Sequence, residues 1–123
     1  MKTRNSVDSA LAERLSKAVT TSSQDGDPID LRIVAGFDFD EVLIFPPDTP
    51  RAAVSKRLGF TFKGELRYSV ESSEFLVFTN NRRFVRFADY RGRLPFTGLK
   101  TPFQSLTAND AVFKVRNGLV GFD

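Results

Sequence analysis

The spacing of apolar residues changes along the chain, from a helical period near the start to alternation and continuous apolar runs later on. Within residues 7–20 the apolar side chains recur every three or four positions, which predicts an amphipathic helix with one buried stripe. The stripe consists of Val7, Leu11, Leu15 and Ala18. The hydroxyl residues at 20–23 and the loop-forming residues at 24–28 are expected to end this helix.

Strand signals follow the first helix. Leu31 and Ile33 alternate with charged residues and predict a short strand. From Phe37 onward apolar and acidic residues alternate, and residues 42–45 are continuously apolar, which is typical of a strand covered on both faces. The prolines at 46–47 are expected to end that strand, because neither can donate a hydrogen bond to a neighbouring strand.

A second helix is predicted from Pro50 to Leu58. Proline suits the first helical position because the N–H it lacks has no partner there. Asp48 or Thr49 can cap the start of this helix, and Gly59 can cap its end.

The second half of the chain is rich in strands. Residues 66–70 alternate, residues 75–78 form another continuous apolar run typical of a central strand, and Asn80-Asn81 is predicted to turn into a partner strand over residues 82–90. Simple alternation predicts two faces for this partner strand. One face has Arg82, Phe84, Arg86 and Tyr90, and the other has Arg83, Val85, Phe87 and Asp89.

The strongest hairpin signal lies near the end of the chain, where residues 111–115 and 119–122 flank Asn117-Gly118. Residues 91–108 are predicted to be irregular, and their apolar side chains are expected to pin them to the core. These side chains are Phe96, Leu99, Phe103 and Leu106.

Because hairpin connections dominate, we expect an α+β fold with a mostly antiparallel sheet of five to seven strands and two helices packed on one face. The length of 123 residues fits a single α+β domain over residues 1–123, with residues 1–6 expected to be flexible.

The composition excludes several chemistries. The chain has no cysteine and no histidine, so disulfides, Cys/His zinc sites and a Ser-His-Asp triad are ruled out. No phosphate-binding or catalytic motif occurs, and we expect no enzymatic activity, no catalytic residue, no cofactor and no metal. No apolar run reaches the ~18 residues that a membrane-spanning helix needs.

Charge is divided unevenly between the two parts of the chain. Residues 1–50 carry five lysines and arginines against nine acidic residues, whereas residues 51–123 carry thirteen against six. Such a basic part can face nucleic acid, anionic lipid or an acidic partner, or can be an ordinary solvated surface, which we favour.

The main candidate for a binding surface lies within the Arg-rich strand and the loop after it. Arginine supplies bidentate contacts to carboxylates, and tyrosine is an amphipathic anchor. The predicted contact residues for an unidentified protein partner are Arg82, Arg86, Tyr90 and Arg93. Alternatively, the same residues belong to a basic nucleic-acid-binding module over residues 82–93, since arginines interleaved with aromatics can grip phosphates and stack on bases.

A secondary acidic candidate is formed by Asp38, Asp40 and Glu41. Asp38 and Asp40 point the same way if they lie on a strand, so they can hold a hard cation or share acid–base work. A solvated outer face explains the same pattern, with one carboxylate bound to the turn or to the arginine-rich strands, and we favour this explanation.

A resemblance to known proteins adds an expected cellular location. The residues concerned are Phe37-Asp38-Phe39-Asp40-Glu41, the apolar strand and prolines up to Pro50, and the helix that ends in Leu58-Gly59. This stretch resembles a group of small bacterial envelope proteins of unknown activity, many of them predicted lipoproteins. Residues 75–78 and 111–115 are also similar to that group.

The resemblance implies a periplasmic or envelope-anchored, non-catalytic interaction or accessory protein. A lipid anchor is implied only if an upstream signal and its cysteine have been removed. Without the resemblance, the expected location is the cytoplasm.

Overall fold

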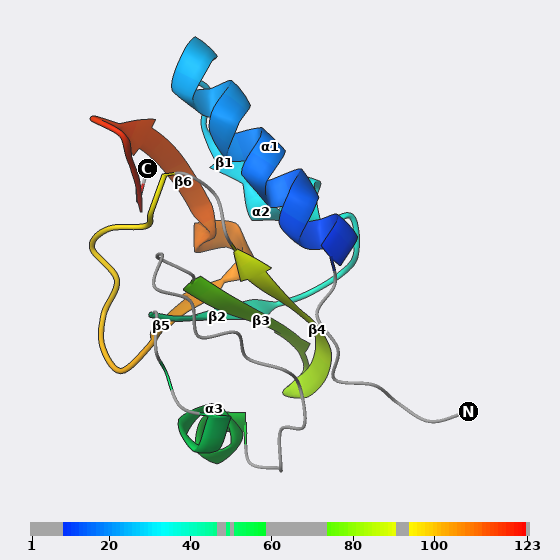
Figure 1. Cartoon of the computed structure of the whole chain (residues 1–123). Helices are drawn as coiled ribbons and strands as arrows, with labels where there is room; N and C mark the ends of the chain where they lie inside the picture. The colour runs from blue at the N-terminus through cyan, green and yellow to red at the C-terminus, as the bar shows by residue number, and fades with distance from the viewer. Residues whose placement is uncertain (1–8, 47–48, 50, 59–73, 91–93, 123) are drawn as a thin grey trace.

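The computed structural model describes residues 9–46, 49, 51–58, 74–90 and 94–122. Figure 1 shows an α+β architecture in which helices lie against two antiparallel sheets, which confirms the predicted fold class. The larger sheet has the strand order β4-β3-β2-β5 and the smaller one β1-β6-β7. The larger sheet consists of β2 (Glu41–Phe45), β3 (Glu74–Asn80), β4 (Arg83–Tyr90) and β5 (Gln104–Thr107). The smaller sheet consists of β1 (Ile29–Asp30), β6 (Val112–Arg116) and β7 (Leu119–Phe122).

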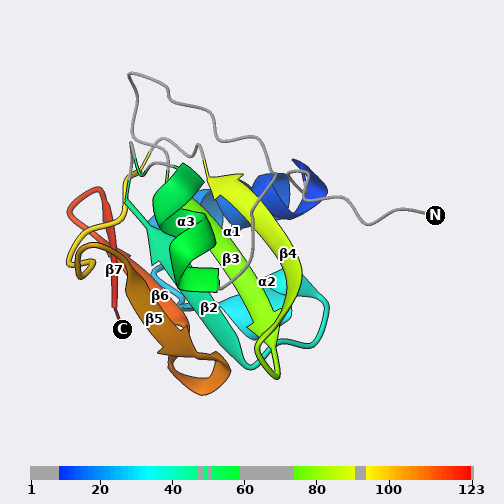
Figure 2. The same cartoon turned by 90° about the horizontal axis from the view of Figure 1, so that it is seen from below.

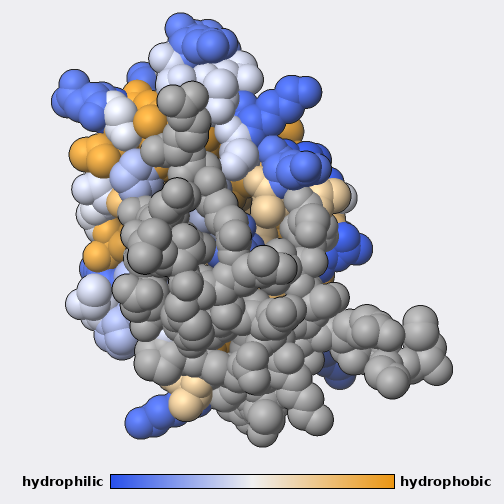
Figure 3. All heavy atoms as spheres, viewed as in Figure 1, coloured by the Kyte–Doolittle hydropathy of each residue, from blue (hydrophilic) through white to orange (hydrophobic). Residues whose placement is uncertain are grey.

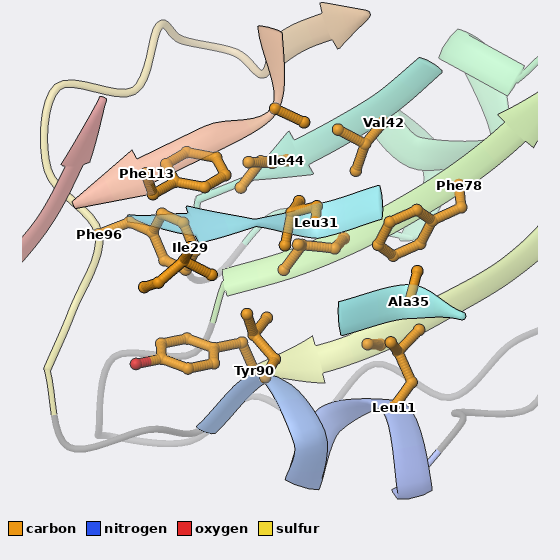
Figure 4. Packing of buried hydrophobic residues seen from close by; sticks show 14 of the residues in the cluster. Leu11, Ile29, Leu31, Ala35, Val42, Ile44, Phe78, Tyr90, Phe96 and Phe113 are labelled. Atoms are coloured by element: carbon orange, nitrogen blue, oxygen red, sulfur yellow. The ribbon is translucent and has the colours of Figure 1, made fainter. Parts of the chain in front are cut away.

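The two central strands are buried on both faces, as their continuous apolar runs predict. Residues 42–45 of β2 and 75–78 of β3 are all buried, and successive side chains enter two different hydrophobic clusters. Val42 and Ile44 belong to the larger cluster beneath helix α1 (Ser9–Asp25), as Figure 4 shows for part of that cluster. Leu43 and Phe45 belong to the smaller one.

The helices cover opposite faces of the larger sheet, and this corrects the prediction that both pack on one face. Helix α1 contributes Leu11 to the larger cluster, whereas Val54 of helix α3 (Arg51–Leu58) lies in the smaller one. Figures 1 and 2 show α3 on one side of β2 and β3 and α1 on the other. Because both faces of β2 and β3 are apolar, each face needs its own cover.

The first helix is longer than predicted. It continues through the hydroxyl residues to Asp25, and the N–H of Gly26 donates to the carbonyl of Ser22. Gly26 has φ +77°, the left-handed conformation that commonly follows a helix. Ser22 is buried and its hydroxyl donates to the carbonyl of Asp27, so a partnered serine extends the helix instead of ending it.

The strand predicted around Leu31 and Ile33 is instead a short helix, α2 (Leu31–Ala35). The Asp30 carboxylate accepts a hydrogen bond from the N–H of Arg32 and caps the start, and Gly36 caps the end at φ +74°. These local signals override the two-residue alternation. As a result Ile33 is 79% exposed.

Several other predictions are confirmed. The second helix occupies Arg51–Leu58, and the last hairpin turns at Asn117-Gly118. The segment before β5 is pinned by Phe96, which is buried and pairs with Val120, although the strand at Gln104–Thr107 was missed. The predicted strand over residues 66–70 and the Gly59 cap lie outside the described residues.

The surface of the described part is mostly polar. In the view of Figure 3, blue hydrophilic side chains stand out along its margins, and hydrophobic ones appear as scattered patches. Ile33 and Leu119 are the large apolar side chains that the described residues expose. Of the described helices, none combines the length and the apolar character needed to cross a bilayer.

Candidate functional site

The β3–β4 hairpin turns at Asn81-Arg82, one residue later than predicted. Asn80 and Arg83 are the last paired residues, and the two residues between them have φ +53° and +66°. This is the left-handed conformation that a type I′ two-residue hairpin turn requires at both positions. Asparagine adopts it readily, but an arginine there costs roughly 1 kcal/mol relative to an ordinary conformation.

Asp40 holds this turn in place. Its carboxylate accepts a hydrogen bond from the N–H of Asn81 at 2.9 Å. Its own N–H donates to the carbonyl of Thr79 at 3.0 Å, and its carbonyl accepts from Ala108 at 2.9 Å. Asp40 therefore connects the turn with β3 and with Ala108, the residue that follows β5.

A register shift in β4 changes which side chains share a face. Phe78 pairs with Arg86 and Thr79 pairs with Phe84, so Val85 is the extra residue of a bulge. Phe84 consequently packs on the smaller cluster, 5.8 Å from the ring of Phe87, instead of lying beside Arg86. The predicted faces are therefore wrong before the bulge, at Arg83 and Phe84, because simple alternation cannot anticipate an inserted residue. After the bulge they are confirmed, since Arg86 and Tyr90 share one face and Phe87 and Asp89 share the other.

Arg86 lies on the other face, where it stacks over an aromatic side chain. Its guanidinium carbon is 5.1 Å from the centre of the Phe37 ring. Phe37 in turn meets Phe78 edge to face at 5.4 Å. This stacking holds an exposed cation against the rim of the core.

Tyr90 is not on the surface. Its side chain is fully buried, and its hydroxyl donates to the carbonyl of Leu94 at 2.6 Å. Burial, and then the charge of Glu74, raise the pKa of its hydroxyl. Figure 4 shows its ring inside the larger cluster, near Phe96. Tyr90 therefore cannot be the surface anchor expected from the sequence, and Arg93 lies outside the described residues.

The three acidic residues of the secondary candidate have different surroundings. Asp38 is exposed, Asp40 binds the turn, and Glu41 lies between two elements. The Glu41 carboxylate accepts from the hydroxyl of Ser105 and lies 3.8 Å from the guanidinium of Arg57. Within the described ranges, no group of three potential metal ligands comes together.

The residues that the structure does bring together are at the end of the β3–β4 hairpin. We call Asn81, Arg82, Arg83 and Arg86 the hairpin tip; all four are exposed. The carboxylate of Asp40 is bound to the backbone of this turn, so three arginines share the tip with at least one carboxylate. Arg83 was assigned to the opposite face by alternation, and its position directly after a turn is the signal that could have identified it.

Comparisons of this chain with models of protein families, with curated proteins and with solved structures find no match.

Proposed function

We propose that this protein is a non-catalytic interaction module that uses its hairpin tip to bind an acidic segment of a protein partner. The observation that carries the proposal is Arg82, an exposed arginine at a backbone position that favours glycine.

A second hairpin in the same chain shows which residue this turn has when no arginine is present. The β6–β7 hairpin makes the same two-residue turn with Asn117-Gly118, at φ +53° and +75°. Stability alone would favour glycine at both second positions. An arginine kept at the strained position fits a role for its guanidinium outside the fold.

The environment of the tip favours a carboxylate partner over nucleic acid. Single-stranded nucleic acids are held by bases stacked on exposed aromatic rings. Around the tip, Tyr90 is buried, Phe84 packs on Phe87, and Phe37 is covered by Arg86. The arginines offer planar guanidinium groups, which pair with carboxylates in a bidentate manner.

The proposal includes the location that the resemblance implies, a bacterial envelope protein exposed to the periplasm. Fractionation of cells that express the full natural reading frame with a C-terminal tag tests it. Recovery with the periplasm or membranes is expected, and recovery with the cytoplasm contradicts this part of the proposal.

Binding to a labelled 20-residue oligoglutamate peptide, followed by fluorescence anisotropy in low salt, tests the interaction. We expect Arg82→Gly and Arg83→Gln each to weaken binding by roughly three- to tenfold, the loss of one charge-assisted contact. Arg116→Gln is the matched control, because it removes an exposed arginine beside the other turn and should change affinity by less than twofold.

An oligothymidylate of the same length separates the alternatives. Tight, steeply salt-dependent binding to it that Arg82→Gly abolishes would replace the acidic-partner proposal with nucleic-acid binding. Equal losses for Arg82→Gly and Arg116→Gln would contradict a role for the hairpin tip.

A further inference from the structure

The turn of the β6–β7 hairpin presents an asparagine followed by a glycine at the surface. Asn117 and Gly118 are both exposed and lie beyond the last paired residues, Arg116 and Leu119. Within the part of the chain that the structure describes, the side-chain amide of Asn117 makes no hydrogen bond. A Cβ added at Gly118 would meet no atom within 4 Å, so the space around the turn is open. Figures 1 and 2 both show this hairpin, in red, at the margin of the molecule.

The backbone conformation of Asn117 suits an intramolecular reaction. The backbone nitrogen of the next residue can attack Cγ of an asparagine and close a five-membered succinimide ring. Because the ring is planar, it holds ψ at about −120°, the value of the first position of a type II′ turn, where φ is about +60°. Asn117 already has φ +53°. Only the peptide plane between Asn117 and Gly118 has to turn over, and glycine accepts φ of either sign.

We propose that Asn117 is a site of spontaneous deamidation, because its turn supplies a glycine nitrogen as the nucleophile. The bond from the Gly118 nitrogen to Cγ forms, the bond from Cγ to Nδ2 breaks, and the amide proton of Gly118 leaves with Nδ2 as ammonia. Water, the co-reactant, then opens the ring. Hydrolysis at Cγ gives aspartate, and hydrolysis at the main-chain carbonyl gives isoaspartate. The reaction involves no oxidation or reduction and is independent of binding at the hairpin tip.

The other asparagines that the structure describes each lack one requirement. The nitrogen that would attack Asn80 belongs to Asn81, and its N–H donates to the carboxylate of Asp40 at 2.9 Å. Asn81 has the same φ of +53° but is followed by an arginine, whose Cβ crowds the attacking nitrogen. The side-chain oxygen of Asn109 accepts a hydrogen bond from the guanidinium of Arg32 at 2.9 Å.

Isoaspartate at this turn would weaken a connection between the two sheets. It places the side-chain methylene in the main chain, so the turn becomes longer and the pairing of β6 with β7 is disturbed beside it. Val120 lies in that part of β7. Its N–H donates to the carbonyl of Pro95 and its carbonyl accepts from the N–H of Thr97, both at 2.9 Å. Either product also adds a negative charge next to Arg116.

The reaction can be followed in the folded, full-length chain at pH 8 and 37 °C, with digestion at mildly acidic pH. Mass spectrometry identifies each asparagine whose amide has become a carboxyl group, and electron-transfer fragmentation separates aspartate from isoaspartate. We expect Asn117 to convert roughly tenfold or more faster than Asn80, Asn81 or Asn109, because only there does an uncrowded glycine nitrogen attack. Equal rates at these asparagines, or an Asn117 that stays intact, would overturn the proposal.

Exchanging the second residue of the two turns provides matched variants. Arg82→Gly should raise the rate at Asn81 by roughly tenfold, and Gly118→Arg should lower the rate at Asn117 by a similar factor. Arg82→Gly keeps the test decisive should Gly118→Arg open the turn or fail to fold, because it relieves backbone strain. An unchanged rate at Asn81 in Arg82→Gly would overturn the role of the glycine nitrogen.

Discussion

The two hairpins of this protein, β3–β4 and β6–β7, make the same turn with different residues. Both place asparagine first, at φ +53°, and both need a left-handed residue second. The β6–β7 turn uses glycine there, whereas the β3–β4 turn uses an exposed arginine. The β3–β4 turn is therefore strained where the β6–β7 turn is not, and the exposed arginines lie at this strained turn.

The two hairpins also differ at their open ends, the ends opposite the turns. The β6–β7 hairpin ends in the pair Phe113 and Phe122, whose rings lie 5.6 Å apart. The β3–β4 hairpin ends in Glu74 and Tyr90, a buried acid beside a buried phenol. The β6–β7 hairpin therefore has the residues that stability favours at both ends, whereas the β3–β4 hairpin has a costly residue at each end. Costly residues of this kind tend to mark function.

The largest predicted effect is a pH-dependent loss of stability caused by Glu74, at the open end of the β3–β4 hairpin. The pKa of Glu74 is raised in the folded state, so its contribution to stability is fully present below about pH 4.5 and is lost as the pH rises to about 7. Relative to Glu74→Gln, the wild type should lose up to about 3 kcal/mol of unfolding free energy over this range. Urea denaturation of both proteins at pH 4.5, 6 and 8.5 measures this loss. A difference in unfolding free energy between the two proteins that does not change with pH would contradict the prediction.

A smaller effect is expected when the second turn is made to resemble the first. Gly118→Arg puts a side chain at φ +75°, where an added Cβ meets no atom within 4 Å. The loss of about 1 kcal/mol should therefore come from backbone strain alone. Chemical denaturation measures it. A neutral Gly118→Arg would show that the arginine in the β3–β4 turn carries no strain.

The reverse change should stabilise the protein. Arg82→Gly relieves strain but makes the unfolded chain more flexible, so the expected gain is roughly 0.5 kcal/mol. The double variant Arg82→Gly with Gly118→Arg should show additive changes, because the two turns are separate. A destabilised Arg82→Gly variant would mean that the arginine supports the fold.

The smallest effect concerns Arg86. Its stacking over Phe37, at 5.1 Å, contributes roughly 0.5 kcal/mol at an exposed site. Arg86→Gln should lose about that amount, and Arg83→Gln, the same charge change at the neighbouring exposed arginine, should lose less. Thermal melts of both variants measure the difference; equal melting temperatures would argue against the stacking.

Local patterns predicted the fold class and its central strands, because the continuous apolar runs at residues 42–45 and 75–78 demand burial on both faces. The Asn117-Gly118 turn was equally visible, since the turn conformation itself selects these residues. The helix at Leu31–Ala35 was missed because its cap, Asp30, also fits an alternating strand.

The candidate site was less accessible to sequence reasoning. The bulge at Val85 exchanges the faces of Arg83 and Phe84 relative to Arg86, and no local signal marks an inserted residue. Alternation correctly places Tyr90 on the face of Arg86, but the exposure expected of a contact residue is wrong, because residues 94–96 fold over its ring. The environment of Glu74 depends on Tyr90 and Phe96, which are distant in sequence, so its burial could not be inferred from its neighbours in the chain.

Arg82→Gly tests the central claim most directly, when stability and affinity are measured on the same preparation. The expected result is a protein at least as stable as the wild type that binds the oligoglutamate peptide roughly three- to tenfold more weakly, while Arg116→Gln binds as the wild type does. An Arg82→Gly protein that is more stable and binds with unchanged affinity would show that the strained arginine has no role in binding.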